Sequence, residues 1–117
     1  MKDRSWFLAT PLSPDLAREG KATVDTLRSD APRSERAQRA FSFIFATGEY
    51  ALSYHFRDPL AALGVGAVTR KALSVALDLA MRGIKGPMRR ILDGMDDEQL
   101  RGVADAIEER LYPDPHG

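Results

Sequence analysis

Residues 41–56 read FSFIFATGEYALSYHF and hold most of the aromatic side chains of the chain. On a helix with 3.6 residues per turn, one apolar stripe recurs at spacings of three and four, at Ala37, Phe41, Ile44, Phe45, Gly48, Leu52 and Phe56. A second stripe at the same spacings holds Phe43, Thr47, Tyr50 and Tyr54. Because a helix that is apolar nearly all round must be surrounded, the segment predicts the central helix of an all-α fold.

Length and composition indicate one globular domain. The chain has 117 residues, of which 44% are hydrophobic and 29% charged, and a chain of this size buries about two-thirds of its unfolded surface. It has no cysteine, which excludes disulfides, zinc ribbons and thiol nucleophiles. Its apolar runs are too short for a secretory signal or a membrane helix. We expect a soluble, cytoplasmic protein with no membrane contact.

Prolines and capping residues mark the expected helix starts. A cap-capable residue precedes a proline three times, in Ser13-Pro14, Asp58-Pro59 and Gly86-Pro87, and Asp96 with Gln99 forms a capping box. The sequence predicts no strand and helices at 14–29, 34–57, 59–63 leading into 67–83, 87–93 and 97–111. We therefore expect a single-domain bundle of four to five helices at 13–112, with an N-terminal arm at 1–12 and a flexible tail at 113–117.

The helix expected at 67–83 is also apolar on two sides. One side holds Val68, Ala72, Val75 and Leu79, and another holds Leu73, Leu77, Ala80 and Ile84. With 34–57 it forms a central aromatic-rich helix pair whose apolar surface needs cover. We expect a homodimer whose protein interface consists of Phe43, Tyr50, Tyr54, Trp6 and Phe7. In the alternative, the first and last helices and the Trp6 arm complete the core of a monomer.

Opposite charges occupy different parts of the chain. Residues 31–92 carry a net charge of +6, and residues 93–117 carry −6. Such segregation fits an anionic partner, an acidic helix laid over a basic surface of the same chain, or separate solvated faces. The bases cluster around the expected helix start at Pro87, at Arg82, Lys85, Arg89 and Arg90. With the free amides of a helix start they are a candidate anion-binding site for a phosphorylated partner, a nucleotide or an acidic helix; the alternative is a solvated basic turn.

The sequence contains no complete catalytic or metal-binding motif. No serine lies in a nucleophile motif, and the residue three before His55 is leucine where a diiron bundle needs an acid. We interpret His55 as a structural histidine bonded to Asp58, with haem or small-ligand binding as a lesser alternative. The sequence thus predicts no enzyme, no cofactor and no metal site.

Residues 59–82 resemble a degenerate helix-turn-helix. A short helix, a turn at Leu63-Gly64-Val65 and a second helix follow one another, with Thr69, Arg70 and Lys71 where a recognition helix meets DNA. Arg70, however, occupies a position where such repressors bury an aliphatic side chain. DNA binding is therefore the second hypothesis. The first is a small non-catalytic regulatory or adaptor protein that acts through protein contacts, as a homo-oligomer.

Overall fold

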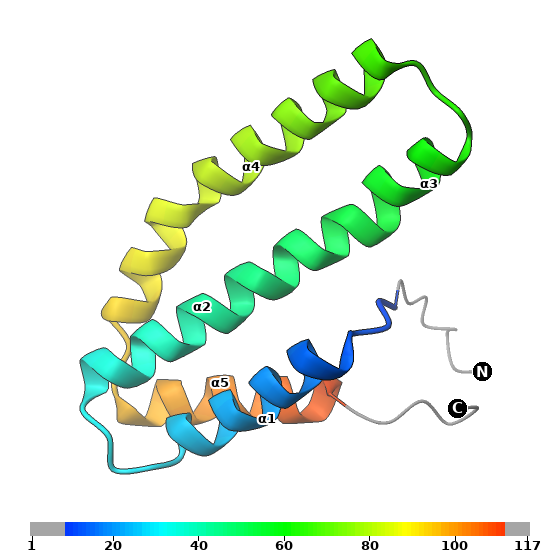
Figure 1. Cartoon of the computed structure of the whole chain (residues 1–117). Helices are drawn as coiled ribbons and strands as arrows, with labels where there is room; N and C mark the ends of the chain where they lie inside the picture. The colour runs from blue at the N-terminus through cyan, green and yellow to red at the C-terminus, as the bar shows by residue number, and fades with distance from the viewer. Residues whose placement is uncertain (1–8, 112–117) are drawn as a thin grey trace, which may run out of the picture.

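Helices account for most of the chain in the computed structural model, which describes residues 9–111. The elements are α1 (Pro14–Leu27), α2 (Arg33–Leu52), the π-helical segment η1 (Ser53–Arg57), α3 (Asp58–Ala62), α4 (Ala67–Asp93) and α5 (Asp97–Arg110) (Figure 1). Residues 9–111 contain no strand, so the prediction of an all-α fold is confirmed for this part of the chain. The predicted tail at 113–117 and residues 1–8 of the predicted arm lie outside the described residues.

Local capping sets two of the helix starts. The Ser13 side chain accepts a hydrogen bond from the amide of Leu16 at 3.2 Å, and Pro14 follows at the first helical position. At the start of α5, Asp96 accepts from the amide of Gln99, whose side chain accepts from the Asp96 amide. The predicted capping box is therefore present.

The predicted helix break at Asp58-Pro59 is wrong, because α2, η1 and α3 form one continuous rod (Figure 1). The backbone of Arg57 and of Asp58 stays helical, and the Asp58 amide donates to the Ser53 carbonyl five residues back. A proline cannot donate to the residue four before it and crowds that carbonyl. The wider π turn just before Pro59 accommodates this crowding without ending the rod.

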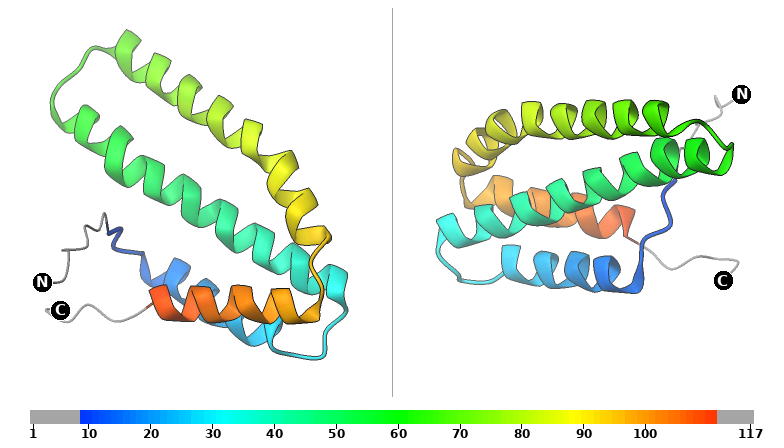
Figure 2. Two further views of the ribbon diagram at one scale, coloured as in Figure 1. Left: turned by 180° about the vertical axis from the view of Figure 1, so that it is seen from behind. Right: turned by 45° about the horizontal axis from the view of Figure 1, so that its top comes forward.

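The predicted break at Gly86-Pro87 is also wrong, since α4 runs through Pro87 without interruption. Figure 2 shows that α4 curves along its C-terminal third, which is the response expected of a helix with an internal proline. The chain instead turns between α3 and α4 at Gly64, whose φ of 74° is the left-handed conformation that glycine adopts at little cost.

The core lies at one end of the molecule. There α1 and α5 pack side by side against the N-terminal half of α2 and the C-terminal end of α4 (Figures 1 and 2). The buried cluster consists of Val24, Leu27, Ala37, Ala40, Phe41, Leu92, Leu100 and Ala104. Away from it, the rest of the α2–η1–α3 rod and α4 project as a helical hairpin.

The projecting hairpin makes the molecule larger than a globule of the same length. The radius of gyration is 16.6 Å, against about 13 Å for a compact domain of this size. Aromatic residues lie on α2 and η1, whereas α4 has none, so an aromatic-rich helix pair is not confirmed. Apolar surface along the hairpin consequently lacks cover from the described part of this chain.

Candidate functional site

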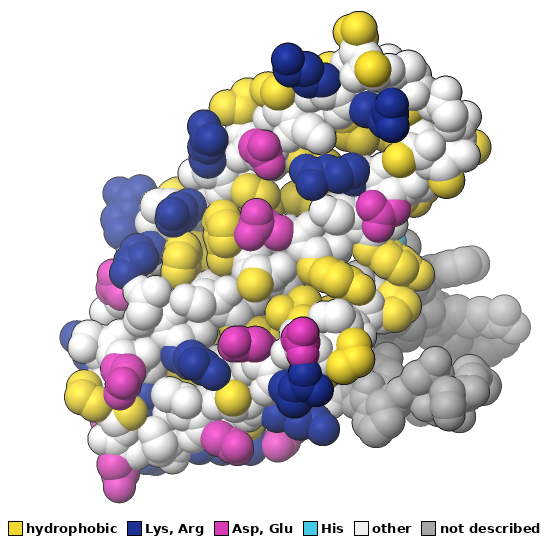
Figure 3. Space-filling view, in the orientation of Figure 1, with side chains coloured by type: hydrophobic (Ala, Val, Ile, Leu, Met, Phe, Trp, Pro, Cys, Tyr) yellow, Lys and Arg dark blue, Asp and Glu magenta, His cyan; other side chains and the backbone are white. Residues whose placement is uncertain are grey.

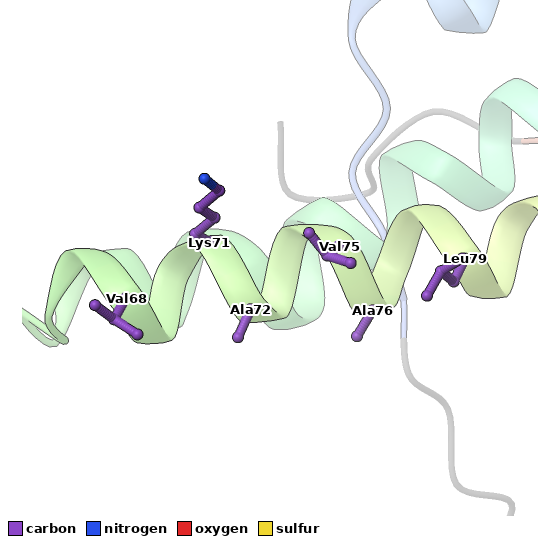
Figure 4. Close-up of a pocket in the computed structure, with 6 residues that line it drawn as sticks. All are labelled: Val68, Lys71, Ala72, Val75, Ala76 and Leu79. Carbon is purple, nitrogen blue, oxygen red and sulfur yellow. The ribbon is translucent and has the colours of Figure 1, made fainter.

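The outer face of α4 is an uncovered apolar feature of the hairpin. Val68 is 84% exposed, Leu79 is 59% exposed and Val75 is 50% exposed, although side chains of this type are usually buried. They line a shallow hollow with Lys71, Ala72 and Ala76. Figure 4 shows Val68, Ala72 and Ala76 pointing to the same side of the helix. We call this surface, made by Val68, Ala72, Val75, Ala76 and Leu79, the α4 face.

The opposite side of α4 explains why this face is free. α4 packs against α2 and η1. Met81 of α4 is buried, and a Cβ atom at Gly48 of α2 would lie 3.4 Å from the Met81 Cε atom. Further along, Leu92 enters the core and Met88 packs against it. α4 is thus an edge helix, and its outer half faces away from α2 (Figure 1).

Small residues continue the α4 face toward the C-terminal end of the helix. Gly83 and Gly86 follow Ala72, Ala76 and Leu79 at spacings of three and four, which keeps them on one side. A Cβ atom built at either glycine meets nothing within 4 Å. Packing among the described residues therefore does not require Gly83 or Gly86 to be glycine. Both glycines leave room for a second helix to approach α4 closely.

The three described residues of the predicted protein interface, Phe43, Tyr50 and Tyr54, differ widely in exposure. Phe43 is buried, 7% exposed, and its ring lies against Gly20 of α1. Tyr50 is half-buried, whereas Tyr54 is 41% exposed and packs edge-on against His55. Trp6 and Phe7 lie outside the described residues. The sequence shows the α4 face as an apolar stripe, but hydrophobic spacing does not indicate which apolar side of a helix stays uncovered.

His55 lies in η1 and contacts the segment before α1. Its Nε2 atom is 2.8 Å from the Thr10 hydroxyl, so the expected bond to Asp58 is wrong and Thr10 is the partner. The two residues are 45 positions apart, and no local pattern indicates such a contact. The bond occupies Nε2, one of the two ring nitrogens through which a histidine can hold a ligand. Within the described residues, no three metal-binding side chains gather into a cluster.

The basic residues near Pro87 are only partly brought together. Arg82, Lys85 and Arg89 share one side of α4, whereas Arg90 lies about 100° further round. Because Pro87 lies inside α4, its neighbourhood offers no free helix-start amides. The predicted anion site therefore lacks its backbone component, and three exposed cations remain.

Carboxylates of α5 pair with bases on α1 and α2. Arg28 binds Asp105 at 2.6 Å and Glu108 at 2.9 Å, and the buried Arg36 binds Asp97. Hydrogen bonding and charge from Arg36 lower the pKa of Asp97, and Arg28 lowers that of Glu108 in the same way. Glu108, followed by Asp105, raises the pKa of Arg28. The acidic helix thus pairs with bases of α1 and α2 and not with the basic residues near Pro87.

The segment resembling a helix-turn-helix has a different geometry. Its first helix, α3, continues the rod of α2 and η1, and α4 runs back beside that rod (Figure 1). A helix-turn-helix instead crosses its helices at about 90–120°. Thr69, Arg70 and Lys71 are exposed in the first turn of α4, and their role in DNA binding stays a prediction.

Comparison with known proteins adds no relative. No protein-family model, characterised protein or solved structure matches the chain. Among the described helices, none is long and apolar enough to cross a membrane. The function is therefore argued from the surface of the hairpin.

Proposed function

We propose that the chain is a small non-catalytic regulatory or adaptor protein that acts through protein contacts, and that the α4 face binds a second copy of the chain. The observation that carries the proposal is the exposure of Val68, Val75 and Leu79 on an edge helix. A soluble protein seldom leaves a contiguous apolar strip of this kind in water unless a partner covers it.

A second copy is the occupant that supplies a matching surface without further assumption. Two α4 faces related by a two-fold axis place apolar side chains against one another, and two helical hairpins joined in this way form an intermolecular four-helix bundle. Ala72, Ala76 and Gly83 allow the helices to come close. The cations nearest the face are Lys71, beside Val68 at one end, and Arg82, one turn beyond Leu79 at the other, which keeps charge away from its centre.

Light scattering over a range of protein concentrations tests the proposal. Wild-type protein is expected to have twice the mass of one chain, and the double variant Val75→Glu with Leu79→Glu the mass of one chain, since each new carboxylate would be buried without a partner. Lys21→Glu, on the exposed side of α1, changes the net charge equally and is the matched control.

Circular dichroism must show that the double variant keeps its helices, because the substituted positions are exposed and outside the core. A folded wild-type monomer at about 100 µM, about a hundredfold above a micromolar dissociation constant, overturns the self-association proposal. A double variant that stays dimeric would place the interface on another surface.

A further inference from the structure

The basic row of α4, defined as Arg82, Lys85 and Arg89, is a second surface that the proposed self-association does not use. The three residues are exposed and recur at i, i+3 and i+7, so they lie on one side of the helix. That side is about 90° round α4 from the α4 face. Figure 3 shows Lys and Arg side chains gathered over α4 with few acidic side chains among them.

None of the basic row pairs with a carboxylate in the described part of the chain. Arginines elsewhere in the bundle are used internally: Arg28 and Arg36 bind α5, and Arg39 lies 3.5 Å from Glu19. Three acids of α5, Asp97, Asp105 and Glu108, are thus engaged with bases of α1 and α2. The described residues leave the row as a strip of positive charge without a paired carboxylate.

Two side chains of the row are held against aromatic rings. The Lys85 Nζ atom lies 5.9 Å from the centre of the Phe45 ring, and the Arg89 guanidinium lies 5.2 Å from the centre of the Phe41 ring. Arg89 also donates a hydrogen bond to the Gln38 side chain. These contacts restrict both side chains before any partner binds, which lowers the entropy cost of fixing them in a complex.

We propose that the basic row binds an acidic helical segment of a partner protein, with carboxylates spaced one to two turns apart. The row spans about 10 Å along the helix, which matches carboxylates at i, i+3 or i+4, and i+7 of a second helix. Nucleic acid fits less well, because binding to duplex DNA typically neutralises six to ten phosphates, and this row offers three cations on a chain of zero net charge.

Fluorescence anisotropy with a labelled, alanine-based helical peptide that carries glutamates at i, i+4 and i+7 tests the proposal. Each exposed pair is worth at most about a fivefold factor in binding, so three moderate pairs together amount to about tenfold. We therefore expect Arg82→Gln, Lys85→Gln and Arg89→Gln together to weaken binding by about tenfold at 50 mM salt. Restoring charge with lysine at positions 82 and 89 should recover most of the loss.

The matched control neutralises three exposed cations elsewhere, by Arg18→Gln, Lys21→Gln and Arg101→Gln, and should change binding less than twofold. Equal weakening by both triple variants, no peptide binding by the wild type at 50 mM salt, or tighter binding of a 20-base-pair duplex through the same three residues would each overturn the proposal. The row variant should remain a dimer in light scattering, and Val75→Glu with Leu79→Glu should still bind the peptide, so the two proposals fail independently.

Discussion

Gly20 of α1 lies against the buried ring of Phe43 on α2. A Cβ atom at this position would lie 2.8 Å from the Leu111 Cδ2 atom and 2.9 Å from the Phe43 Cζ atom, and the Phe43 ring is buried. An alanine would therefore force two side chains to move in a packed region. The sequence marks Gly20 only as a glycine inside an expected helix, because the ring that occupies the space belongs to a residue 23 positions away.

Gly20→Ala compared with Gly102→Ala isolates this contact. Both glycines lie inside helices, and a Cβ atom at Gly102 meets nothing within 4 Å, so the gain in helix propensity is common to both variants. We expect Gly20→Ala to unfold at a free energy about 1–3 kcal/mol below that of Gly102→Ala in urea titrations. Equal stabilities would show that Phe43 and Leu111 repack without cost.

The ion pair of Asp97 with the buried Arg36 links stability to pH. Because Arg36 lowers the pKa of Asp97 in the folded state, the pair adds stability above the unfolded pKa of about 3.9 and loses it as the pH falls through the lower folded value. Asp97→Asn should be less stable than wild type at pH 7, and the difference should shrink from about pH 4 to pH 2.

Urea unfolding at several pH values measures this difference. Asp25→Asn is the control, since Asp25 is exposed and pairs with no cation in the described part of the chain. A difference in unfolding free energy between Asp97→Asn and wild type that stays constant down to pH 2 would mean that protonation of Asp97 does not affect folding. The two outcomes are distinct because Arg36 keeps its charge throughout this range.

At the scale of elements, the sequence was informative wherever a helix end depends on near neighbours. The Ser13 cap and the Asp96–Gln99 capping box involve residues three positions apart, and both were predicted. Pro59 and Pro87 wrongly predicted helix starts. A proline suits the first position of a helix, but it marks a start only where no helical turn precedes it. Here the preceding turns are stabilised by packing on the opposite helix of the hairpin, and the prolines lie inside continuous rods.

Pro87→Ala tests whether Pro87 lowers the free energy of unfolding or is needed for the curvature of α4. An internal proline lacks one helix hydrogen bond and crowds the carbonyl of Gly83, at a cost of up to about 3 kcal/mol. We expect the alanine variant to gain about 1–3 kcal/mol in urea unfolding. A loss would show that the curvature of α4 is needed to bring Met88 and Leu92 into the core.

At the scale of the whole molecule, the all-helical fold followed from periodicity, but the position of the core did not. Hydrophobic spacing shows which side of a helix is apolar, and it does not show which of two apolar sides meets a neighbour. Along α2 and η1 the aromatic second stripe is split between the core, at Phe43, and the surface, at Tyr54. For α4 the inner side packs at Met81 and Leu92, and the stripe from Val68 to Leu79 is left outside.

The contrast between the buried core end and the exposed N-terminal half of α4 predicts that local stability differs along the chain. It also predicts that the stability of α4 depends on self-association. The core end, around Leu27 and Leu100, is fully buried and should exchange its amide hydrogens only through global unfolding. The N-terminal half of α4 has exposed side chains and one packed side, so in a monomer its amides should exchange faster by local opening. A second copy on the α4 face would oppose that opening, because local separation of α4 would also disrupt the interface.

Hydrogen exchange followed by mass spectrometry at about 1 µM and about 100 µM protein, concentrations that bracket a dissociation constant in the micromolar range, measures this coupling. Peptides covering 67–80 should exchange more slowly at the higher concentration, whereas peptides covering 97–110 should show no change. The effect should vanish in Val75→Glu with Leu79→Glu and persist in Lys21→Glu. Slow, concentration-independent exchange at 67–80 would contradict the prediction, because the hairpin would then be stable in a single chain and its exposed face would need no partner for order.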